Sequence, residues 1–492
     1  MGIKFSEKNL KIVGYILLAG LIYLPIFGHL ENLPIRIWDE ARLAVNAYEM
    51  YKNGNWVVTY FNGQPEMWNT KPPLMIWLQS LGMHIFGPGE LAVRLPSAIA
   101  TFLLFIGLLY FNEKYIKNFW FGVFTILVLV TSNGFINLHA SRTGDYDALL
   151  TLFTTLFGLS FFYYLETEKN KVLYLSFIFI TLAVLTKSIQ GLLFLPGLFI
   201  FTLIHRKLLV LLKNKHFYFG ILLFVMVVAG YYLLRESVNP GYLEAVYFNE
   251  LGGRYLESLE GHNEPFWFFY DHIRLYYYKE WLWFLPLGLI TGLLVHKREI
   301  RRLTLFSAIL IVSYFLIISA SQTKLYWYDV PMYPFMAIIC AVFIFYVFSF
   351  VKDKVRVRKA WINPLILLIL IVSVYYEPYR KIIKKTYTPQ VYSWEKEDYE
   401  IEYLLRDAIR GKYDLSNYLI LHKNYNVHLM FYMNILNDEG RNIRFAKAED
   451  IKPGDTIVIH QEEMKNFVEA HYNFEDLYTR KNVKIYKIDG RK

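Results

Sequence analysis

The chain has 492 residues, of which 55% are hydrophobic and 18% aromatic, and its formal net charge is +10. A soluble chain of this length could not bury so much apolar surface, so the composition predicts an integral membrane protein. Most basic residues lie in short loops between apolar runs, which favours orientation in a bilayer over nucleic-acid binding.

The N-terminus begins with a basic segment and an apolar stretch. Lys4, Lys8 and Lys11 precede the apolar residues from Ile12 to Gly28, and no small-residue cleavage site follows. This pattern predicts a retained signal anchor.

Eleven apolar runs of spanning or near-spanning length follow one another along the first 377 residues. Backbone groups in lipid must hydrogen-bond within their own segment, so each run is predicted to be a helix. The runs cover residues 10–29, 95–112, 119–137, 146–165, 171–186, 189–205, 217–235, 281–296, 303–320, 330–350 and 361–377. We therefore expect an α-helical polytopic membrane protein with about 11 to 13 transmembrane helices.

The distribution of basic residues predicts the orientation. With the N-terminus inside, the five inside loops hold 17 Lys and Arg residues, whereas the three short outside loops hold one each. This asymmetry follows the positive-inside rule and places the long segments 30–94 and 236–280 outside. A basic cluster after the last run opposes the rule, and it consists of Arg380, Lys381, Lys384 and Lys385.

The composition changes after about residue 378. The pattern predicts an amphipathic helix at Tyr399–Arg410 and short strands at Tyr418–His422, Thr456–His460 and Val483–Ile488. We expect a transmembrane domain over residues 1–377 and a small soluble α/β domain over 378–492 on the non-cytoplasmic side.

Asp39 and Glu40 directly follow the first apolar run. Residues Ala41 to Lys52 continue as an amphipathic helix that is predicted to lie at the membrane surface. The carboxylate pair could serve as general base and orienting partner, or it could cap the helix. The pair alone favours the cap.

Lys71 stands before Pro72 and Pro73, which can start a helix. A lysine at a helix start beside the bilayer is well placed for a phosphate. The alternative is a lysine that reaches from the bilayer to the interface, and Lys71 alone favours that alternative.

Further charged residues stand at the ends of apolar runs. Asp145 suits a helix cap, whereas Asp147 lies further inside and needs a partner or a role; Lys187, between two apolar runs, is similar. Arg254 in the long outside segment could clamp a phosphate or pair with a nearby glutamate, at even odds. Lys324 and Tyr328 open a later run from the same side, where a tyrosine can also be an aromatic-belt residue.

Together, these stretches resemble the GT-C membrane glycosyltransferases, and within them the aminoarabinose transferase and protein O-mannosyltransferase superfamily. The matching stretches run in the family's order over roughly residues 10–340. They are Asp39–Arg42, Asn62-Gly63, Lys71–Pro73, Arg94–Ser97, Arg142–Asp147, Leu185–Lys187, Gly253–Tyr255 and Lys324–Pro334.

The resemblance implies a polyprenyl-phosphate sugar donor and an inverting transfer. It implies that Asp39 lies at the catalytic centre, with Glu40 and Asp147 as further catalytic candidates. It also implies that Lys71, Arg254 and Tyr328 contact the donor phosphate. Asp145, Lys187 and Lys324 remain secondary candidates.

Two positions depart from the aminoarabinose transferases. Thr70 stands where they have Glu, and the stretch 249–252 lacks their histidine. Because those two family residues are associated with a bound zinc, the sequence predicts no zinc of that kind and does not support aminoarabinose as the sugar. No cofactor is implied, although weak binding of a divalent cation through Asp39 and Asp147 stays open.

The sequence thus predicts an enzyme of the cytoplasmic membrane whose active site faces the periplasm or exterior. It would move a sugar from a polyprenyl phosphate to a lipid, glycan or protein acceptor. A flippase of lipid-linked saccharides is the main alternative, although we find no internal repeat. A scaffold and an oligosaccharide ligase are further alternatives, and the sugar and the polyprenol length stay open.

Overall fold

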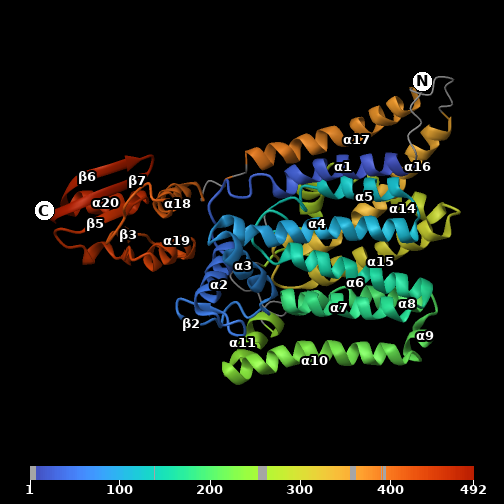
Figure 1. The fold of residues 1–492 in the computed structure, drawn as a ribbon, viewed down its shortest axis with the longest axis horizontal. Helices are drawn as coiled ribbons and strands as arrows, with labels where there is room; N and C mark the ends of the chain where they lie inside the picture. Colours follow the sequence, from blue (N-terminus) through green and yellow to red (C-terminus); the bar gives the residue numbers. More distant parts are fainter. Residues whose placement is uncertain (1–6, 138, 253–262, 355–361, 389–390, 392–394) are drawn as a thin grey trace.

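A computed structural model describes residues 7–137, 139–252, 263–354, 362–388, 391 and 395–492. The molecule is elongated, with long helices side by side along its length and a small α/β domain at one end (Figure 1). Each of the eleven predicted runs contains a helix. These helices are α1 (Glu7–Phe27), α4 (Glu90–Tyr115), α5 (Phe119–Val130), α6 (Asp147–Thr167), α7 (Asn170–Lys187), α8 (Leu195–Ile204), α10 (Lys215–Val238), α14 (Phe284–Leu294), α15 (Arg298–Ala320), α16 (Tyr333–Lys354) and α17 (Ile362–Tyr387).

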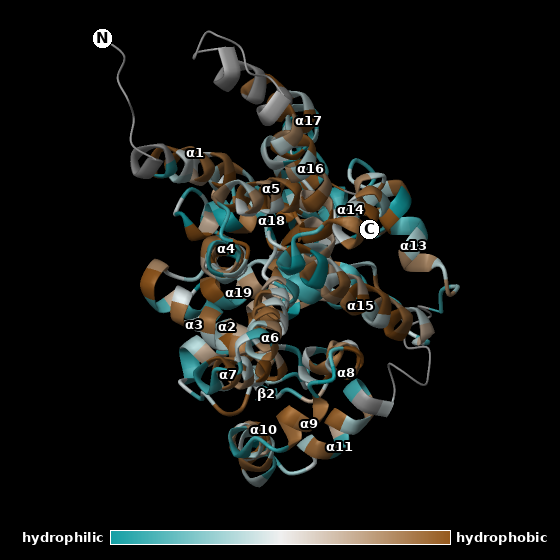
Figure 2. Cartoon of the chain, turned by 90° about the vertical axis from the view of Figure 1, so that its right-hand side faces the viewer, coloured by the Kyte–Doolittle hydropathy of each residue, from teal (hydrophilic) through white to brown (hydrophobic). Residues whose placement is uncertain are grey.

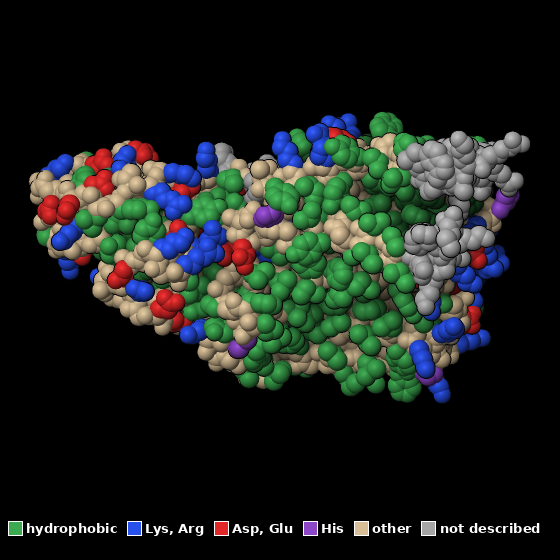
Figure 3. Space-filling view, turned by 45° about the horizontal axis from the view of Figure 1, so that its top comes forward, with side chains coloured by type: hydrophobic (Ala, Val, Ile, Leu, Met, Phe, Trp, Pro, Cys, Tyr) green, Lys and Arg blue, Asp and Glu red, His purple; other side chains and the backbone are tan. Residues whose placement is uncertain are grey.

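Within the described residues, six helices are long and apolar enough to cross a membrane, and they are α4, α6, α7, α10, α15 and α16. The most apolar stretch of α6 is 78% buried and that of α10 only 11%, so α6 is central and α10 lies at the rim (Figure 2). Apolar side chains cover the flank of the helical part, and charged side chains gather beyond it (Figure 3). The protein is therefore a multi-pass membrane protein.

The loops predicted to lie inside contact one another at one end of the helices. Lys297 Nζ donates to the carbonyl of Ile116 at 2.8 Å, and Arg302 forms a 2.9 Å ion pair with Glu166. A further contact joins Asn214 to the 166–171 loop. Four of the five base-rich loops therefore share one face, as the charge count predicts, and most of the fifth, 352–359, lies outside the described residues.

The last long helix, α17, extends ten residues beyond the predicted run and contains the basic cluster that opposed the positive-inside rule. Two of its bases have carboxylate partners, because Arg380 pairs with Glu377 and Lys381 with Glu280, each at 3.0 Å. Local pairing reduces the net charge of this segment. The division expected at residue 378 falls inside α17.

The C-terminal domain contains a five-stranded sheet in the order β4-β3-β5-β7-β6. Strand β3 is parallel to its neighbours β4 and β5, whereas β7 is antiparallel to its neighbours β5 and β6. Its elements are α18 (Lys396–Ile409), β3 (Leu419–Leu421), α19 (Val427–Asp438), β4 (Arg444–Ala446), β5 (Thr456–Ile459), α20 (Glu462–His471), β6 (Tyr472–Arg480) and β7 (Val483–Arg491). The predicted helix and three strands are all present.

Helix α2 (Asp39–Asn53) joins this domain to the helical part. Its apolar face was predicted to lie at the membrane surface, but it packs against α3 (Leu74–Phe86), α18 and α19 in one continuous apolar core. Polar contacts support the junction, since Tyr48 donates to Asp438 at 2.5 Å and Tyr432 donates to Glu90 at 2.8 Å. Protein rather than lipid therefore covers the apolar face of α2.

Candidate active site

Asp39 is the first residue of α2 and follows a strained residue. Trp38 has a φ of 75°, a conformation that non-glycine residues rarely adopt and that is held here by surrounding contacts. The Trp38 ring stacks on Tyr425 of the C-terminal domain at 4.4 Å. The Asp39 side chain is 55% exposed, and its carboxylate lies 3.9 Å from His139 Nδ1. An accessible carboxylate beside an imidazole can accept a proton from a bound hydroxyl or amine.

Glu40, its neighbour, is fully buried and surrounded by donors. Arg94 approaches its carboxylate through two nitrogens at 2.7 and 2.8 Å, and the backbone N–H groups of Arg36 and Gly144 donate at 2.8 Å each. Burial would raise the pKa of Glu40, but Arg94 and the backbone donors lower it below its usual value. Glu40 therefore anchors the first turn of α2, because both of its carboxylate oxygens are bound by Arg94 and by backbone N–H groups.

Arg94 links this anchor to the preceding loop. Its guanidinium also donates to the carbonyls of Leu30, Leu33 and Pro34 at 2.6 to 2.7 Å. These bonds hold the chain between α1 and α2 in place, which determines where Asp39 emerges.

His139 lies between two carboxylates. Its ring stacks on Trp327 at 3.5 Å, and Nδ1 lies 3.4 Å from Asp145 Oδ2, on the side that faces Asp39. Burial would lower the pKa of His139, but Asp145, Asp39 and Asp147 raise it above its usual value.

Lys71 pairs with the long outside segment. Its Nζ lies 3.0 Å from Glu250 Oε1 and 5.7 Å from the centre of the Tyr146 ring. The Lys71 side chain is 11% exposed and that of Glu250 only 2%, so the ammonium is at the edge of the buried region. The predicted helix follows directly, because α3 begins at Leu74.

Asp147 has a buried partner. Lys187 Nζ donates to both of its carboxylate oxygens, at 2.7 and 2.8 Å, and lies 5.4 Å from the centre of the Tyr328 ring. Next to Tyr328, the buried Asp329 accepts a 2.9 Å hydrogen bond from Tyr333. The sequence predicted a partner or a role for Asp147, and Lys187 is that partner.

Three consecutive residues, Asp145–Asp147, bring these groups together. The first lies against His139, which approaches Asp39. The Tyr146 ring faces the Lys71 ammonium, and Asp147 pairs with Lys187. Seven of the nine candidate residues therefore belong to this segment or lie close to it. Glu40 is one of them, because it accepts a hydrogen bond from the backbone of Gly144.

The other two candidates differ. Lys324 Nζ donates to the carbonyls of Glu264 and Ser321, so it ties together two loop segments. Arg254 lies outside the described residues.

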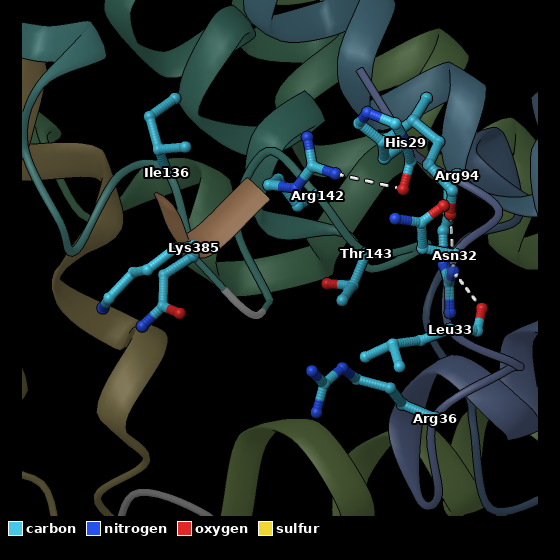
Figure 4. Close-up of a pocket in the computed structure, with 11 residues that line it drawn as sticks. His29, Asn32, Leu33, Arg36, Arg94, Ile136, Arg142, Thr143 and Lys385 are labelled. Carbon is cyan, nitrogen blue, oxygen red and sulfur yellow. Dashed lines mark hydrogen bonds between the residues drawn. The ribbon is translucent and has the colours of Figure 1, made fainter. Parts of the chain in front are cut away.

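A basic pocket is lined by residues of the 136–143 segment, which includes Arg142 and Thr143, and by the chain between α1 and α2 (Figure 4). Four cationic side chains line it, and they are Arg36, Arg94, Arg142 and Lys385. Arg142 donates to the carbonyls of Pro25 and Gly28, and burial and Arg94 lower its pKa to about 10. No carboxylate is among the pocket's described lining residues.

The residues here do not fit the zinc associated with aminoarabinose transferases. Thr70 is buried and offers only a neutral hydroxyl, and the nearby Glu250 carboxylate is paired with Lys71. A different set of oxygen and nitrogen atoms, from Asp39, His139 and Asp145, lies within 4.8 Å of one another. At this end of the helices, the candidate ligands for a divalent cation thus lie beside Asp39 and not beside Thr70, and Asp147, which pairs with Lys187, is not among them.

Two members of the site were not identified from the sequence. His139 lies six residues before Asp145, and a histidine outside the apolar runs, in the same short loop as Arg142 and Asp145, is the signal that points to it. Glu250 is one of the nearby glutamates that the sequence offers only as partners for Arg254. Its pairing with Lys71 joins residues far apart in the chain, which no local pattern reveals.

Comparison with known proteins gives both sequence and fold matches. A family model described as dolichyl-phosphate-mannose-protein mannosyltransferase matches residues 70–232. An uncharacterized protein of Aquifex aeolicus is 30% identical, over 63% of this chain and 60% of its own length. The undecaprenyl phosphate-alpha-4-amino-4-deoxy-L-arabinose arabinosyl transferase 1 of Proteus mirabilis is 25% identical, over 74% of this chain and 64% of its own. The chain thus spans under two thirds of the length of these relatives.

Solved structures share the fold over nearly the whole chain. ArnT from Cupriavidus metallidurans, in a crystal structure bound to undecaprenyl phosphate, has a TM-score of 0.71 at 15% identity, covering 98% of both chains. The oligosaccharyltransferase of Archaeoglobus fulgidus has a TM-score of 0.57 at 11% identity, covering 98% of this chain and 74% of its own.

Proposed function

We propose that this chain, which belongs to the GT-C superfamily of membrane glycosyltransferases, transfers a sugar from a polyprenyl-phosphate carrier to an acceptor hydroxyl or amine. The observation that carries the proposal is the arrangement around Asp145–Asp147. There an exposed carboxylate and an ammonium at the edge of the buried region lie on either side of one short segment. Glycosyl transfer from a phosphate needs these two charges, one to take a proton and one to stabilise the leaving group.

Asp39 is the proposed base. The acceptor oxygen or nitrogen attacks the anomeric carbon, the bond from that carbon to the phosphate oxygen breaks, and the acceptor proton moves to Asp39. His139 and Asp145 position this carboxylate, because His139 lies between the two. Attack opposite the phosphate inverts the anomeric configuration.

Lys71 is the proposed partner of the leaving polyprenyl phosphate. Its present partner, Glu250, is replaced or joined by the phosphate when the donor binds, and the ammonium then offsets the charge that grows as the bond breaks. The proposed phosphate position is bordered by Lys187, Asp147 and Tyr328. The buried ion pair between Lys187 and Asp147 holds both side chains in place there.

The basic pocket is the proposed position for an anionic part of the acceptor. Its lining includes Thr143 and four cationic side chains, of which Arg94 and Arg36 also pair with Glu40 and Glu395. Arg142 and Lys385 are therefore the lining cations that form no ion pair with a carboxylate within the described residues. An acceptor with a phosphate or carboxylate group would be held there by charge-assisted hydrogen bonds. Arg142→Gln should raise the KM for the acceptor while the KM for the donor stays constant. If both KM values of the variant equal those of the wild type, the pocket is not part of the acceptor site.

We place the enzyme in the cytoplasmic membrane, with the site facing the periplasm or exterior. The support is the clustering of base-rich loops at the other end of the helices. A flippase is the less favoured function, because the exposed carboxylate lies at the end of the helices and not at mid-depth.

The deciding experiment combines a deletion strain with a reconstituted assay. Mass spectrometry of glycolipids and glycoproteins should show one glycan that lacks a sugar in the deletion strain. The purified protein should then restore that sugar from a synthetic short-chain polyprenyl-phosphate donor. Translocation of the donor without transfer would support the flippase instead.

A further inference from the structure

Two histidines lie side by side at one edge of the C-terminal sheet. The parallel strands β3 and β5 end at Leu421 and Ile459, and His422 and His460 are the next residues. Carboxyl ends of neighbouring parallel strands meet at one edge, which is where ligands commonly bind. The two rings stack at 5.1 Å, and His422 Nδ1 lies 3.2 Å from His460 Nε2.

Two helices add three more groups at the same place. Asp398 and Glu402 lie one turn apart on α18 and share a face, and His428 extends from α19. Asp398 Oδ1 lies 2.9 Å from His460 Nε2 and 4.0 Å from His428 Nε2. Glu402 Oε1 lies 3.8 Å from the same nitrogen of His428.

The protons on these side chains are too few to give every nitrogen and oxygen of the cluster a hydrogen bond. His422 Nε2 lies 2.9 Å from the carbonyl of Tyr425, and because a carbonyl only accepts, that nitrogen carries the proton. Nδ1 of the neutral ring then presents a lone pair to His460. His460 Nε2 has a single proton to share between that lone pair and Asp398 Oδ1.

The two most deeply buried members lack hydrogen-bond partners altogether. Within the described residues, both ring nitrogens of His428 and both carboxylate oxygens of Glu402 are buried without one. A neutral imidazole nitrogen that has no hydrogen-bond partner offers a lone pair that a metal can accept. Buried polar groups without partners are costly, and a cation bound by one nitrogen of His428 would remove part of that cost.

We propose that this cluster binds a divalent transition-metal ion, Zn²⁺, through His422, His428, His460 and Asp398. Bonds of 2.0 to 2.1 Å in a tetrahedral site separate neighbouring donor atoms by about 3.3 Å, close to the 2.9 and 3.2 Å contacts among His422, His460 and Asp398. The fourth donor, His428 Nε2, lies 4.0 Å from Asp398 Oδ1 and would move closer when the ion binds. The bond from His422 Nε2 to a backbone carbonyl is the usual way in which the second nitrogen of a metal-binding histidine is oriented.

The position of the site gives it a structural role near the membrane half. His422 holds the turn that carries Tyr425, whose hydroxyl donates to the carbonyl of Trp38 at 3.2 Å while its ring stacks on the indole. Trp38 is the strained residue that precedes Asp39. The metal would therefore fix the turn that supports Trp38, a consequence for activity that rests on the function proposed above.

The test uses the full-length protein in detergent. After treatment with a chelator, the protein is incubated with Zn²⁺, desalted and analysed for bound metal. We expect about one tightly bound ion per chain, and X-ray absorption should show three imidazole nitrogens and one oxygen. Wild-type protein that takes up no zinc would overturn the proposal.

Variants assign the position. His422→Ala combined with His460→Ala should lose the ion, whereas His471→Ala, at an exposed histidine of the same domain, should keep it. If the double variant does not fold, Asp398→Asn and the imidazole count in the wild type decide. A spectrum with one imidazole, or zinc lost on His139→Ala and kept without His422 and His460, would assign the metal to Asp39, His139 and Asp145 and refute this site.

A readout other than activity tests the link to Trp38. Hydrogen exchange should rise in residues 36–39 and 422–426 after zinc is removed, and it should stay unchanged in the distant loop 166–171. Unchanged exchange near Trp38 together with stoichiometric zinc would keep the metal site and refute the supporting role.

Discussion

Asp39 should be required for transfer but not for folding. Asp39→Asn keeps the shape of the side chain and removes its charge and basicity, so we expect transfer to fall by about 10²–10⁴-fold with donor binding retained. The measurement is sugar transfer from a short-chain polyprenyl-phosphate donor, with binding followed in parallel. Asp489→Asn, at an exposed position of β7, is the control. Near-normal turnover in Asp39→Asn would transfer the role of base to Asp147.

Lys71 should determine affinity for the carrier. Lys71→Ala removes one charge-assisted contact, worth roughly 1.5–3 kcal/mol, so the dissociation constant for polyprenyl phosphate should rise by about 10- to 100-fold. The change also leaves the buried Glu250 without its ammonium partner, which lowers stability.

A second variant separates these two effects. Lys71→Ala with Glu250→Gln should restore the melting temperature while binding remains weak. Lys52→Ala, at an exposed ion pair with Asp438, is the control. Carrier affinity equal to wild type in both variants would exclude Lys71 from the donor site.

The sequence identified several individual site residues, but it did not predict which residues they contact. Asp39, Lys71 and Asp147 stand out because charges beside apolar runs are costly without a use. Glu250 and His139 were missed because their partners are distant in the chain or depend on a loop. Glu40 shows the same limit, since only the fold reveals that Arg94 occupies its carboxylate.

The stability of α2 depends on the buried ion pair between Glu40 and Arg94. Arg94→Ala would leave the Glu40 carboxylate buried without a counter-charge, a change that typically costs about 3–5 kcal/mol. We expect a lower melting temperature and faster hydrogen exchange in α2. Arg380→Ala, which disrupts an exposed pair, should change neither.

The same pair predicts a pH dependence. The folded-state pKa of Glu40 is lowered, so its contribution to stability is fully present above the unfolded value of about 4.3 and is lost as the pH falls through the folded value. In Glu40→Gln, stability should be lower near neutral pH and should change less in acid. A variant that loses stability in acid as steeply as wild type would show that other carboxylates dominate.

The elements themselves were predictable to the extent that apolar runs define them. Every run contains a helix, because lipid leaves the backbone no other partner. Strand β6 was not predicted, since its charged sequence Tyr472–Arg480 has little apolar alternation and it is an edge strand defined by pairing with β7. The face of α2 was assigned to lipid because an amphipathic pattern does not say what covers it.

At the scale of the whole molecule, the C-terminal domain is part of the structure around the site. One apolar core runs from α2 and α3 into α18 and α19, and the ion pair between Arg36 and Glu395 joins the two parts at 2.9 Å. Composition alone separates the domain from the helices, but it does not reveal this shared core. The fold thus makes the position of Asp39 depend on residues more than 350 positions away.

This architecture predicts which surfaces reagents reach from outside the cell. A short hairpin of β1 (Tyr60–Phe61) and β2 (Gln64–Pro65) and the C-terminal domain lie at the end of the helices where α2 begins, and the base-rich loops lie at the opposite end. Single cysteines would be introduced at exposed positions by Asn62→Cys, Glu475→Cys and Lys213→Cys. The natural Cys340 is buried and is replaced by alanine to remove background.

A membrane-impermeant maleimide should label the Asn62 and Glu475 variants in intact cells, after the outer membrane is made permeable if one is present. The Lys213 variant should react only when the cytoplasmic membrane is opened, because its loop belongs to the base-rich set that the positive-inside rule keeps in the cytoplasm. The reverse pattern would place Asp39 and Lys71 on the cytoplasmic side and overturn transfer on the outer face. Labelling of Asn62 without Glu475 would contradict the shared core, since the fold holds both on one side of the membrane.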